Sequence, residues 1–182
     1  AVTLLAVIGL LPLAGAPFAG QTLVQRLSWM PAVGLDLAFR LDGLGLLFAL
    51  LILGIGLLII LYARYYLPEQ DRLGRFYAGL LLFMGSMLGV ALAENLILLL
   101  IFWELTSLSS FLLISYWPQD SDARNGARMA LTVTGAGGLA LLGGFLLLGH
   151  IAGSYDLTVI LASGETIRAH PLYTPMLILV LL

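Results

Sequence analysis

The stretch LILLLIFWELTSLSSFLLISY, residues 96–116, contains a single charged side chain, Glu104, in a run of apolar and weakly polar residues. A helix rises 1.5 Å per residue, so about 20 residues cross the ~30 Å hydrocarbon core of a bilayer. The stretch is therefore long enough to predict a transmembrane helix. Since Glu104 follows Leu96 by eight positions and precedes Tyr116 by twelve, its carboxyl group is expected roughly 12 Å from one end of that helix and ~18 Å from the other.

The composition of the whole chain agrees with a bilayer environment. Of its 182 residues, 61% are hydrophobic and 10% are charged, against about 45–50% and 25% in an ordinary soluble domain. Polar side chains are too few to cover a water-facing surface, so a soluble globular fold is excluded. The net charge of -2 and the singly scattered Arg residues argue against nucleic acid as a partner. Cys is absent and no metal-ligand spacing is found, so neither a metal nor a cofactor is expected.

Six apolar runs predict an all-α polytopic membrane protein with five complete transmembrane helices and the start of a sixth. We expect these helices near residues 1–18, 44–62, 76–93, 96–116, 129–149 and 172–182. For the first run a cleaved signal peptide is the alternative, but the run lacks a basic n-region. The long connections 19–41 and 150–171 contain apolar residues and are expected to form short surface helices. The chain opens with Ala1 and closes inside an apolar run, so we expect a fragment of one larger transmembrane domain.

The Arg residues predict which way the helices cross the membrane. Five lie in the short connections after the second and fourth runs, and three lie in the two long connections. By the positive-inside rule the short connections are cytoplasmic, and the connections 19–41 and 150–171 are extracytoplasmic. Aromatic side chains after the same two runs predict an interfacial belt on the cytoplasmic side. The short connections hold Arg64, Arg72, Arg75, Arg124 and Arg128, and the belt would comprise Tyr62, Tyr65, Tyr66, Tyr116 and Trp117.

Glu104 is the strongest candidate for chemistry. A carboxylate at the centre of a membrane helix costs about 2.5–3.5 kcal/mol even on lenient insertion scales, so it faces protein or water, or it takes up a proton. A group that exchanges protons at that depth is what a proton path needs. The favoured prediction is therefore proton transfer by Glu104, and the alternative is a protonated Glu104 that hydrogen-bonds a neighbouring helix. A charge contact with Arg124 or Arg128 is a less favoured alternative.

Two further residues are candidates for the same path. Ser107 lies one turn after Glu104 on the same helix face, where its hydroxyl would donate a hydrogen bond to the carboxylate or order a water beside it. Helix packing is an equal alternative for Ser107. His150 follows the run 129–149, where an imidazolium would meet the negative end of the helix dipole. That role is favoured for His150 over a place in a proton relay.

The remaining polar and small residues have simpler predicted roles. Asp42 directly precedes an apolar run and is predicted to cap the N-terminus of a helix. Glu94 and Asn95 stand where the run 96–116 begins, so capping is the default, with attraction of cations to the mouth of a pathway as the alternative. The glycines of the run 129–149 are predicted to let helices approach closely; they are Gly135, Gly137, Gly138, Gly143 and Gly144.

The run around Glu104 also resembles a known family. FWELTSLSSFLLI, residues 102–114, is similar to the glutamate-bearing helix of the A-type subunit of the Mrp-type multisubunit sodium/proton antiporters. Two more stretches are similar to that protein in matching order: RLDGL, residues 40–44, leading to LYAR, residues 61–64, and AGSYDL, residues 152–157. The resemblance covers nearly the whole chain.

The resemblance implies a proton-translocating membrane module related to the large pump subunits, such as the L-type subunit, of NADH-quinone oxidoreductase. In that family the glutamate that matches Glu104 pairs with a lysine two helices later, and the sequence reaches Leu182 before any Lys. The implied protein is a transporter rather than an enzyme, and it sits in the bacterial cell (inner) membrane. Its partners would be the lipid bilayer, the other antiporter subunits, protons and a monovalent cation, Na+ in the first place.

Two alternatives to the antiporter remain at this stage. One is a redox-driven pump subunit of an NADH-quinone oxidoreductase, which would use Glu104 in a similar way. The stretch Leu105-Thr106-Ser107 favours the antiporter, because the related dehydrogenase subunit typically has a glycine-rich continuation there. The other alternative is a scaffold helix bundle in which Glu104 is structural.

Overall fold

The computed structural model describes residues 2–30, 35–67, 73–117 and 119–182. Arg72, one of the residues behind the predicted orientation, lies outside these ranges. The elements in chain order are α1 (Val2–Leu10), the 3-10 helix η1 (Leu11–Leu13), α2 (Gly15–Phe18), β1 (Leu23–Met30), β2 (Leu35–Leu41), α3 (Gly43–Tyr66), α4 (Leu73–Leu92), α5 (Leu96–Ile114), α6 (Ser121–Ala152), α7 (Leu157–Ala162), α8 (Gly164–Ala169) and α9 (Tyr173–Leu181).

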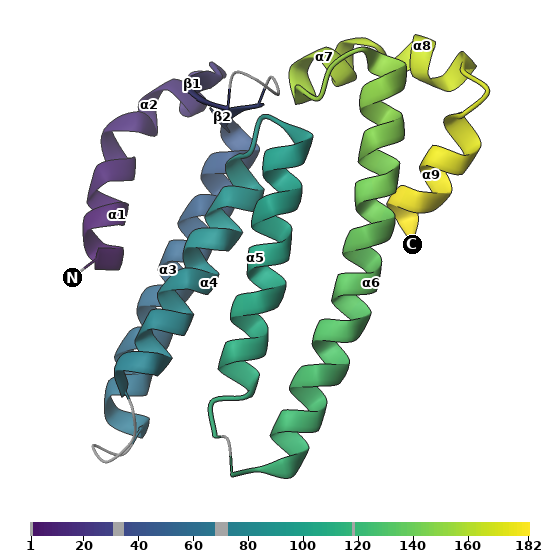
Figure 1. Cartoon of the computed structure of the whole chain (residues 1–182). Coiled ribbons are helices and arrows are strands. Elements are labelled where there is room, and N and C mark those ends of the chain that lie inside the picture. The colour runs from purple at the N-terminus through teal and green to yellow at the C-terminus, as the bar shows by residue number, and fades with distance from the viewer. Residues whose placement is uncertain (1, 31–34, 68–72, 118) are drawn as a thin grey trace.

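Four of these helices, α3, α4, α5 and α6, are long and apolar enough to cross a membrane. They run side by side, and each packs on the next in chain order (Figure 1). Large apolar side chains stand on their outer faces, among them Leu44, Leu58 and Val133, each more than 60% exposed. Such a surface is compatible with lipid and not with water. The prediction of a mostly helical, multi-spanning membrane protein is therefore confirmed.

The two ends of the chain leave the predicted count of five complete helices and the start of a sixth unconfirmed. The segment 1–18 divides into α1, η1 and α2, and α9 is a helix of 9 residues, so neither belongs to the four long spans of the described chain. Pro12 is the physical reason in the first segment, because it lacks an N–H and its ring clashes with the preceding turn of an α-helix. In contrast, α6 is longer than the predicted run 129–149, because Asp120 caps it by accepting from the backbone N–H groups of Asp122 and Ala123.

The prediction of an all-α fold is wrong in the connection 19–41. Instead of a surface helix, β1 and β2 form an antiparallel hairpin with Leu23 opposite Leu41 and an irregularity between Ser28 and Met30. The sequence of β2, LDLAFRL, alternates apolar and other residues with a period of two, which is typical of a strand and not of a helix. The connection 150–171 does form the expected short helices, α7 and α8.

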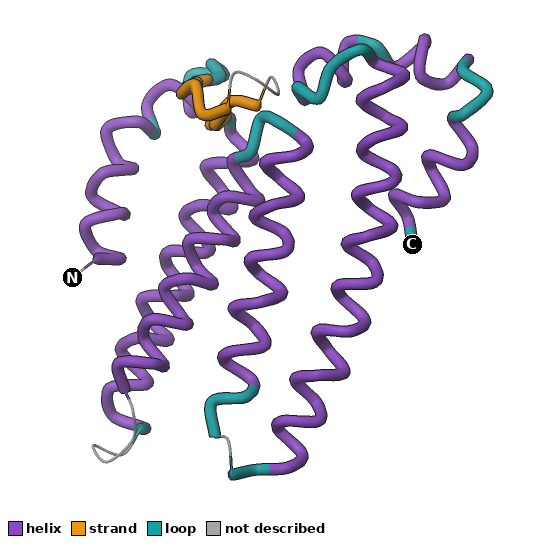
Figure 2. Tube along the Cα trace, in the orientation of Figure 1, coloured by secondary structure: helices purple, strands orange, loops and turns teal. Residues whose placement is uncertain are grey.

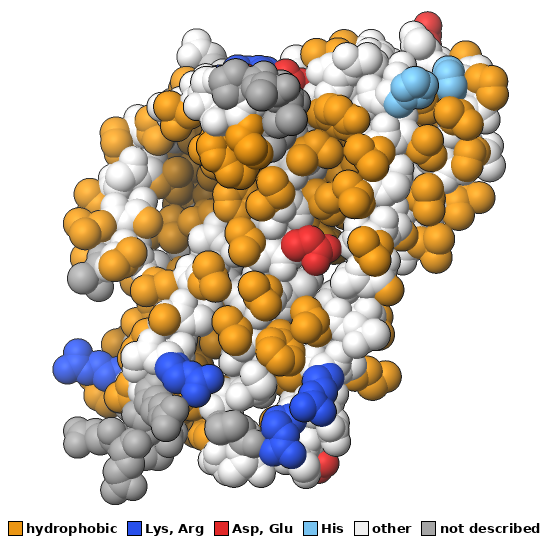
Figure 3. All heavy atoms as spheres, viewed as in Figure 1, with side chains coloured by type: hydrophobic (Ala, Val, Ile, Leu, Met, Phe, Trp, Pro, Cys, Tyr) orange, Lys and Arg blue, Asp and Glu red, His pale blue; other side chains and the backbone are white. Residues whose placement is uncertain are grey.

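The two ends of the helix bundle have different structures. The hairpin, the α4–α5 turn and helices α7 and α8 gather at one end, shown at the top of Figures 1 and 2. The C-terminal ends of α3 and α5 and the N-terminal ends of α4 and α6 lie at the opposite end, where basic side chains gather on the visible face in Figure 3. The arginines near these helix ends are Arg64, Arg75, Arg124 and Arg128. An apolar core under the hairpin end joins α5, α6, α7, α8 and α9 through Leu96, Leu100, Phe145, Ile160, Ile167 and Met176.

Candidate functional site

Glu104 lies in the middle of α5 and faces the middle of α6. The helix places it about 12 Å from Leu96 and about 15 Å from Ile114 along its axis. Its carboxyl group lies directly against Gly138, because a Cβ atom at position 138 would overlap Glu104 Oε1 and lie 2.8 Å from Cδ. Gly138 is buried in the α5–α6 contact. The absence of a side chain at 138 therefore creates the space that the carboxyl group fills.

The surroundings of the Glu104 carboxyl group are poor in polar groups. Within residues 2–30, 35–67, 73–117 and 119–182, no hydrogen bond or ion pair reaches it, and the side chain is exposed in this chain. In Figure 3 an acidic side chain lies in the middle of an otherwise apolar face, and the basic side chains lie at the lower end. A carboxyl group at this depth needs a proton, a cation or water as its partner.

The hydroxyls that follow Glu104 satisfy the backbone of their own helix. Ser107 is nearly buried and its hydroxyl donates to the carbonyl of Trp103 at 3.4 Å, so it forms no hydrogen bond to Glu104 among the described contacts. Thr106 donates to the same carbonyl at 2.6 Å, and Ser109 donates to the carbonyl of Leu105 at 2.7 Å. Bonds of this kind to the preceding turn let hydroxyl side chains sit inside a membrane helix.

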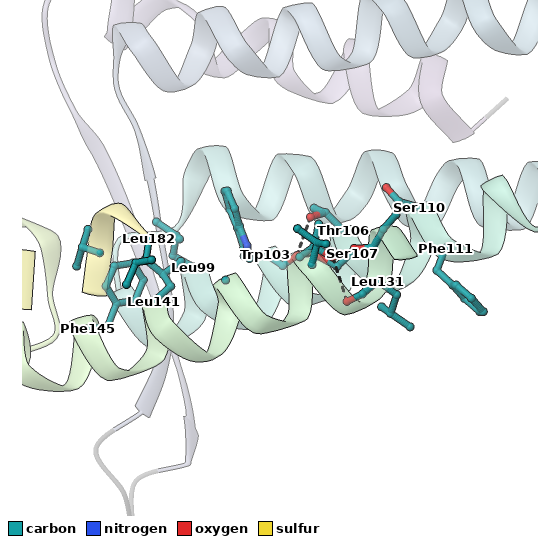
Figure 4. Close-up of a pocket in the computed structure, with 15 residues that line it drawn as sticks. Leu99, Trp103, Thr106, Ser107, Ser110, Phe111, Leu131, Leu141, Phe145 and Leu182 are labelled. Carbon is teal, nitrogen blue, oxygen red and sulfur yellow. Dashed lines mark hydrogen bonds between the residues drawn. The ribbon is translucent and has the colours of Figure 1, made fainter. Parts of the chain in front are cut away.

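A groove of about 550 Å³ runs along α5 and α6; Trp103 and Ser107 line it, whereas Glu104 does not. Its polar lining comes from Thr106, Ser107, Ser110 and Thr134, and the rest of its wall is apolar. Figure 4 shows Trp103, Thr106 and Ser107 in its middle, with Leu141, Phe145 and Leu182 toward one end. The groove therefore brings hydroxyl groups to the depth of the mid-membrane carboxyl group.

The structure does not bring His150 to Glu104. His150 is exposed in the last turn of α6, and the twelve residues between Gly138 and His150 correspond to about 18 Å of helix. Arg128, near the other end of α6, is separated from Gly138 by about 15 Å of helix. The predicted site residues therefore form two groups, with Glu104 and Ser107 in mid-span and His150 at the hairpin end.

The predicted caps are present, with one difference. Asp42 accepts from the N–H of Gly45 at 2.8 Å and caps α3, and Asn95 accepts from the N–H groups of Ile97 and Leu98 and caps α5. Glu94 does not cap α5, the helix for which capping was predicted. Its Oε1 accepts hydrogen bonds from the backbone N–H and the hydroxyl of Thr158 in α7, and the side chain is fully buried.

Other charged groups surround Glu94 at the hairpin end. Arg40 of β2 donates from Nε and Nη2 to Asp42 Oδ2 at 3.1 Å, and its Nη1 lies 3.8 Å from Glu94 Oε2. Arg26 of β1 donates to Asp156 at 2.8 Å; this hydrogen bond, with the Coulombic attraction behind it, raises the pKa of Arg26 above its ordinary value. Sequence reasoning did not pair these residues because their contacts depend on the unpredicted hairpin.

Comparison with known proteins identifies the family. The family described as NADH-Ubiquinone oxidoreductase (complex I), chain 5 N-terminus, matches residues 29–77, and the family described as NADH:quinone oxidoreductase/Mrp antiporter, TM, matches residues 93–182. The chain is 57% identical over 164 residues to a probable K(+)/H(+) antiporter A/B subunit of Rhizobium meliloti, a match that covers 90% of this chain and 16% of that protein. It is 48% identical over 164 residues to the Na(+)/H(+) antiporter A1 subunit of Staphylococcus haemolyticus, which corresponds to 90% of this chain and 20% of the relative.

Solved structures give the same result. The Mrp complex from a Dietzia species contains a chain that matches with a TM-score of 0.80 and 34% identity over 87% of this chain and 17% of that chain. A chain of the archaeal membrane-bound sulfane sulfur reductase matches with a TM-score of 0.73 and 19% identity over 97% of this chain and 27% of its own length, and so shares the fold. The chain thus spans about a fifth of the relatives' length. Together these matches show that the chain belongs to the antiporter-like membrane protein family that NADH:quinone oxidoreductases and Mrp antiporters share.

Proposed function

We propose that this chain is part of one subunit in a multisubunit monovalent cation/proton antiporter and that Glu104 carries protons through the middle of the membrane. The observation that supports this most strongly is a carboxyl group in mid-span, set against Gly138, with no side-chain partner in the described chain. Relatives named K(+)/H(+) and Na(+)/H(+) antiporter subunits support the reaction class. Na+ is the proposed cation, and the protein is proposed to be a transporter and not an enzyme.

The chemistry at Glu104 follows from its surroundings. A carboxyl group in the middle of a membrane helix needs a proton or a cation as its partner. Each approach and withdrawal of a positive charge would therefore release and rebind one proton. The resemblance to the Mrp antiporters assigns that charge to a lysine of a later helix, and the 182 residues contain no Lys. Ser107 and the hydroxyl-lined groove would hold water for proton exchange.

Orientation and location complete the proposal. The hairpin end is extracytoplasmic, because the arginines of the short connections lie at the other end. The segment 1–18 and α9 also enter the bilayer, as the fifth complete span and the start of a sixth, since apolar side chains such as Leu5 and Leu181 are exposed on them. The membrane is the bacterial inner membrane, and the other antiporter subunits are the protein partners.

A proton-pumping subunit of an NADH-quinone oxidoreductase is the second candidate. The match of residues 29–77 to the complex I chain 5 family favours it. It differs from the first candidate in its energy source, because a pump would move protons only when electrons flow, whereas an antiporter responds to cation and proton gradients alone.

The test uses the complete antiporter complex in inside-out membrane vesicles. Glu104→Gln should lower cation-driven proton movement by at least about 10²-fold, since the amide keeps the shape but carries no exchangeable acid proton. Glu104→Asp should retain part of the activity. Glu165→Gln, at an exposed acid of α8, is the matched control. Full transport by the Glu104→Gln complex would refute the proposal.

A further inference from the structure

A second carboxyl group, Glu94, is buried at the hairpin end in a way that a helix cap does not require. It lies in the turn between α4 and α5, and its side chain is 0% exposed. The backbone of Glu94 is held on two sides, because its N–H donates to the carbonyl of Ala38 at 2.9 Å and its carbonyl accepts from the N–H of Leu157 at 2.7 Å. The hairpin and α7 therefore fix the position of this carboxyl group.

The two oxygens of Glu94 have unequal surroundings. Oε1 accepts from the N–H of Thr158 at 3.1 Å and from its hydroxyl. Oε2 is buried and has no hydrogen-bond partner among the described residues, and the nearest cationic atom is Arg40 Nη1 at 3.8 Å. A buried oxygen without a donor is destabilising, and more so when it is charged. Oε2 is therefore the atom on which a proton would be held.

Arg40 is shared between two carboxylates, since it pairs with Asp42 at 3.1 Å and, more distantly, with Glu94 Oε2 at 3.8 Å. Its Nε and Nη2 atoms both contact Asp42 Oδ2, so Asp42 is the closer partner of this guanidinium. The second guanidinium at this end, Arg26, is paired with Asp156 at 2.8 Å. Two guanidinium groups thus face the three carboxylates of Asp42, Glu94 and Asp156, so this group has one acid in excess.

The remaining groups around Glu94 do not supply the missing positive charge. Asn95 is uncharged and donates to Asp156 at 3.2 Å, and Asp36 is a further acid whose charge acts on Arg26 together with that of Glu94. Among the paired acids, the side chains of Asp42 and Asp156 are 32% and 21% exposed, against 0% for Glu94. Burying an unbalanced charge is costly, so Glu94 is the acid of this group whose protonation relieves the most electrostatic cost.

We propose that Glu94 is a second proton-binding group, which exchanges a proton with the aqueous phase on the hairpin side of the membrane. The proton adds to Oε2 from a hydronium ion and returns to water when the carboxyl group ionises. A cavity of about 370 Å³ lies beside the turn that carries Glu94; Arg40, Asp42, Ala93 and Leu157 line it, and Glu94 does not. Under this proposal the proton passes between that cavity and Oε2. Since Asp42 holds Arg40, protonation of Glu94 leaves no unpaired guanidinium in the described part of this cluster.

Glu94 and Glu104 bind protons at separate sites, without direct transfer between them. Glu104 lies about 12 Å along α5 from Leu96, Glu94 lies in the turn before that helix, and buried apolar side chains such as Leu98 and Leu100 lie between them. Direct transfer between the two carboxyl groups is excluded by this distance. The inference rests on the proposed function in one respect: protons that cross at Glu104 would enter or leave through the end at which Glu94 lies.

The experiment uses the complete complex in liposomes with only the pH on the hairpin side varied. The wild-type transport rate should show a titration step that Glu94→Gln removes and Glu94→Asp shifts along the pH axis. Glu165→Gln, an exposed acid on the same end of the bundle, should keep the wild-type step. An unchanged step in both Glu94 variants would overturn the proposal, and so would an unchanged step in Glu94→Asp alone if the Gln variant does not assemble.

A second readout does not depend on transport. Infrared spectra of the complex recorded against pH should contain the C=O stretch of a protonated carboxyl group that Glu94→Gln removes. If the Glu104→Gln complex transports normally, the proposed function fails, yet this band still decides whether Glu94 binds a proton. A pH-dependent carboxyl spectrum identical in wild type and Glu94→Gln would overturn the inference and leave the role of Glu104 untouched.

Discussion

Glu94 and Glu104 lie ten residues apart in the sequence and have opposite surroundings. Glu94, at the end of the bundle, is fully buried, accepts two hydrogen bonds from Thr158 and has Arg40 nearby. Glu104, in mid-span, has an exposed side chain against the bare backbone of Gly138 and no described polar partner. The polar side-chain contacts described at Glu94 join distant segments at the hairpin end. Glu104 has none among the described residues, which agrees with its proposed role as a proton carrier.

The largest effect is expected from a substitution at Gly138, which tests the contact between this residue and Glu104. Gly138→Ala places a Cβ atom on the carboxyl group of Glu104, and overpacking of this kind costs about 1–3 kcal/mol. We expect cation-driven proton transport by the complete complex to fall by about tenfold, the factor that corresponds to ~1.4 kcal/mol. Gly135→Ala is the matched control, since a Cβ atom there meets nothing within 4 Å. Equal transport by the two variants would show that the contact with Gly138 does not position Glu104.

A substitution at Thr158 tests the hydrogen bonds that hold Glu94. Thr158→Val removes the hydroxyl that donates to Glu94 Oε1 but keeps the N–H that also donates to it, so the free energy of unfolding should fall by about 0.5–1.5 kcal/mol, the net contribution of one hydrogen bond. The midpoint of thermal unfolding of the purified complex measures this. Thr132→Val serves as the control, because that exposed hydroxyl donates to a carbonyl of its own helix. A loss in the control as large as in Thr158→Val would contradict the assigned role.

The cap of α5 connects the two regions, since Asn95 separates Glu94 from the helix that carries Glu104. Asn95→Ala removes the acceptor for the N–H groups of Ile97 and Leu98 and should cost about 1 kcal/mol of stability. Asn95→Ser keeps a capping acceptor and brings no negative charge to Asp156, to which Asn95 Nδ2 donates at 3.2 Å, so it should lose less. Thermal unfolding of the complex distinguishes them, and equal losses would mean that capping is not what Asn95 contributes.

The ion pair between Arg26 and Asp156 should give the smallest effect. The Arg26 side chain is 45% exposed, and exposed ion pairs contribute about 0–1 kcal/mol. Arg26→Gln should therefore change the unfolding midpoint little at low salt and not at all at high salt. A loss larger than that of Asn95→Ala, or one that salt does not reduce, would show that the hairpin depends on this pair more than its exposure indicates.

The sequence predicts the mid-span region better than the hairpin end. Uncharged runs predict the helices α3 to α6, and the single charge in α5 predicts the depth of Glu104, because both depend on residues close together in the chain. The sequence also predicts Gly138 as a small packing residue, but its contact with Glu104 depends on the rotation of two helices about their axes. The spacing of residues along the chain does not determine how the two helices are rotated relative to each other.

The hairpin end depends on contacts between distant segments. Glu94 meets Thr158 across 64 positions, and Arg26 meets Asp156 across 130. The alternation of LDLAFRL, residues 35–41, is a signal for β2, but the overall apolar character of the chain favours helices everywhere. If the segment 19–41 is predicted to be a surface helix, nothing indicates that Arg40 lies beside Glu94. Capping of a helix is then the only role predicted for Glu94 by default.

The most direct test of the central claim measures proton flux through the complete complex in liposomes while a gradient of the transported cation is the only driving force. With wild type, the interior pH should change as cations move, and with Glu104→Gln it should stay constant although the complex is assembled and Glu165→Gln behaves as wild type. A proton flux through the Glu104→Gln complex equal to that of wild type would contradict the account, because protons would then cross the membrane without this carboxyl group.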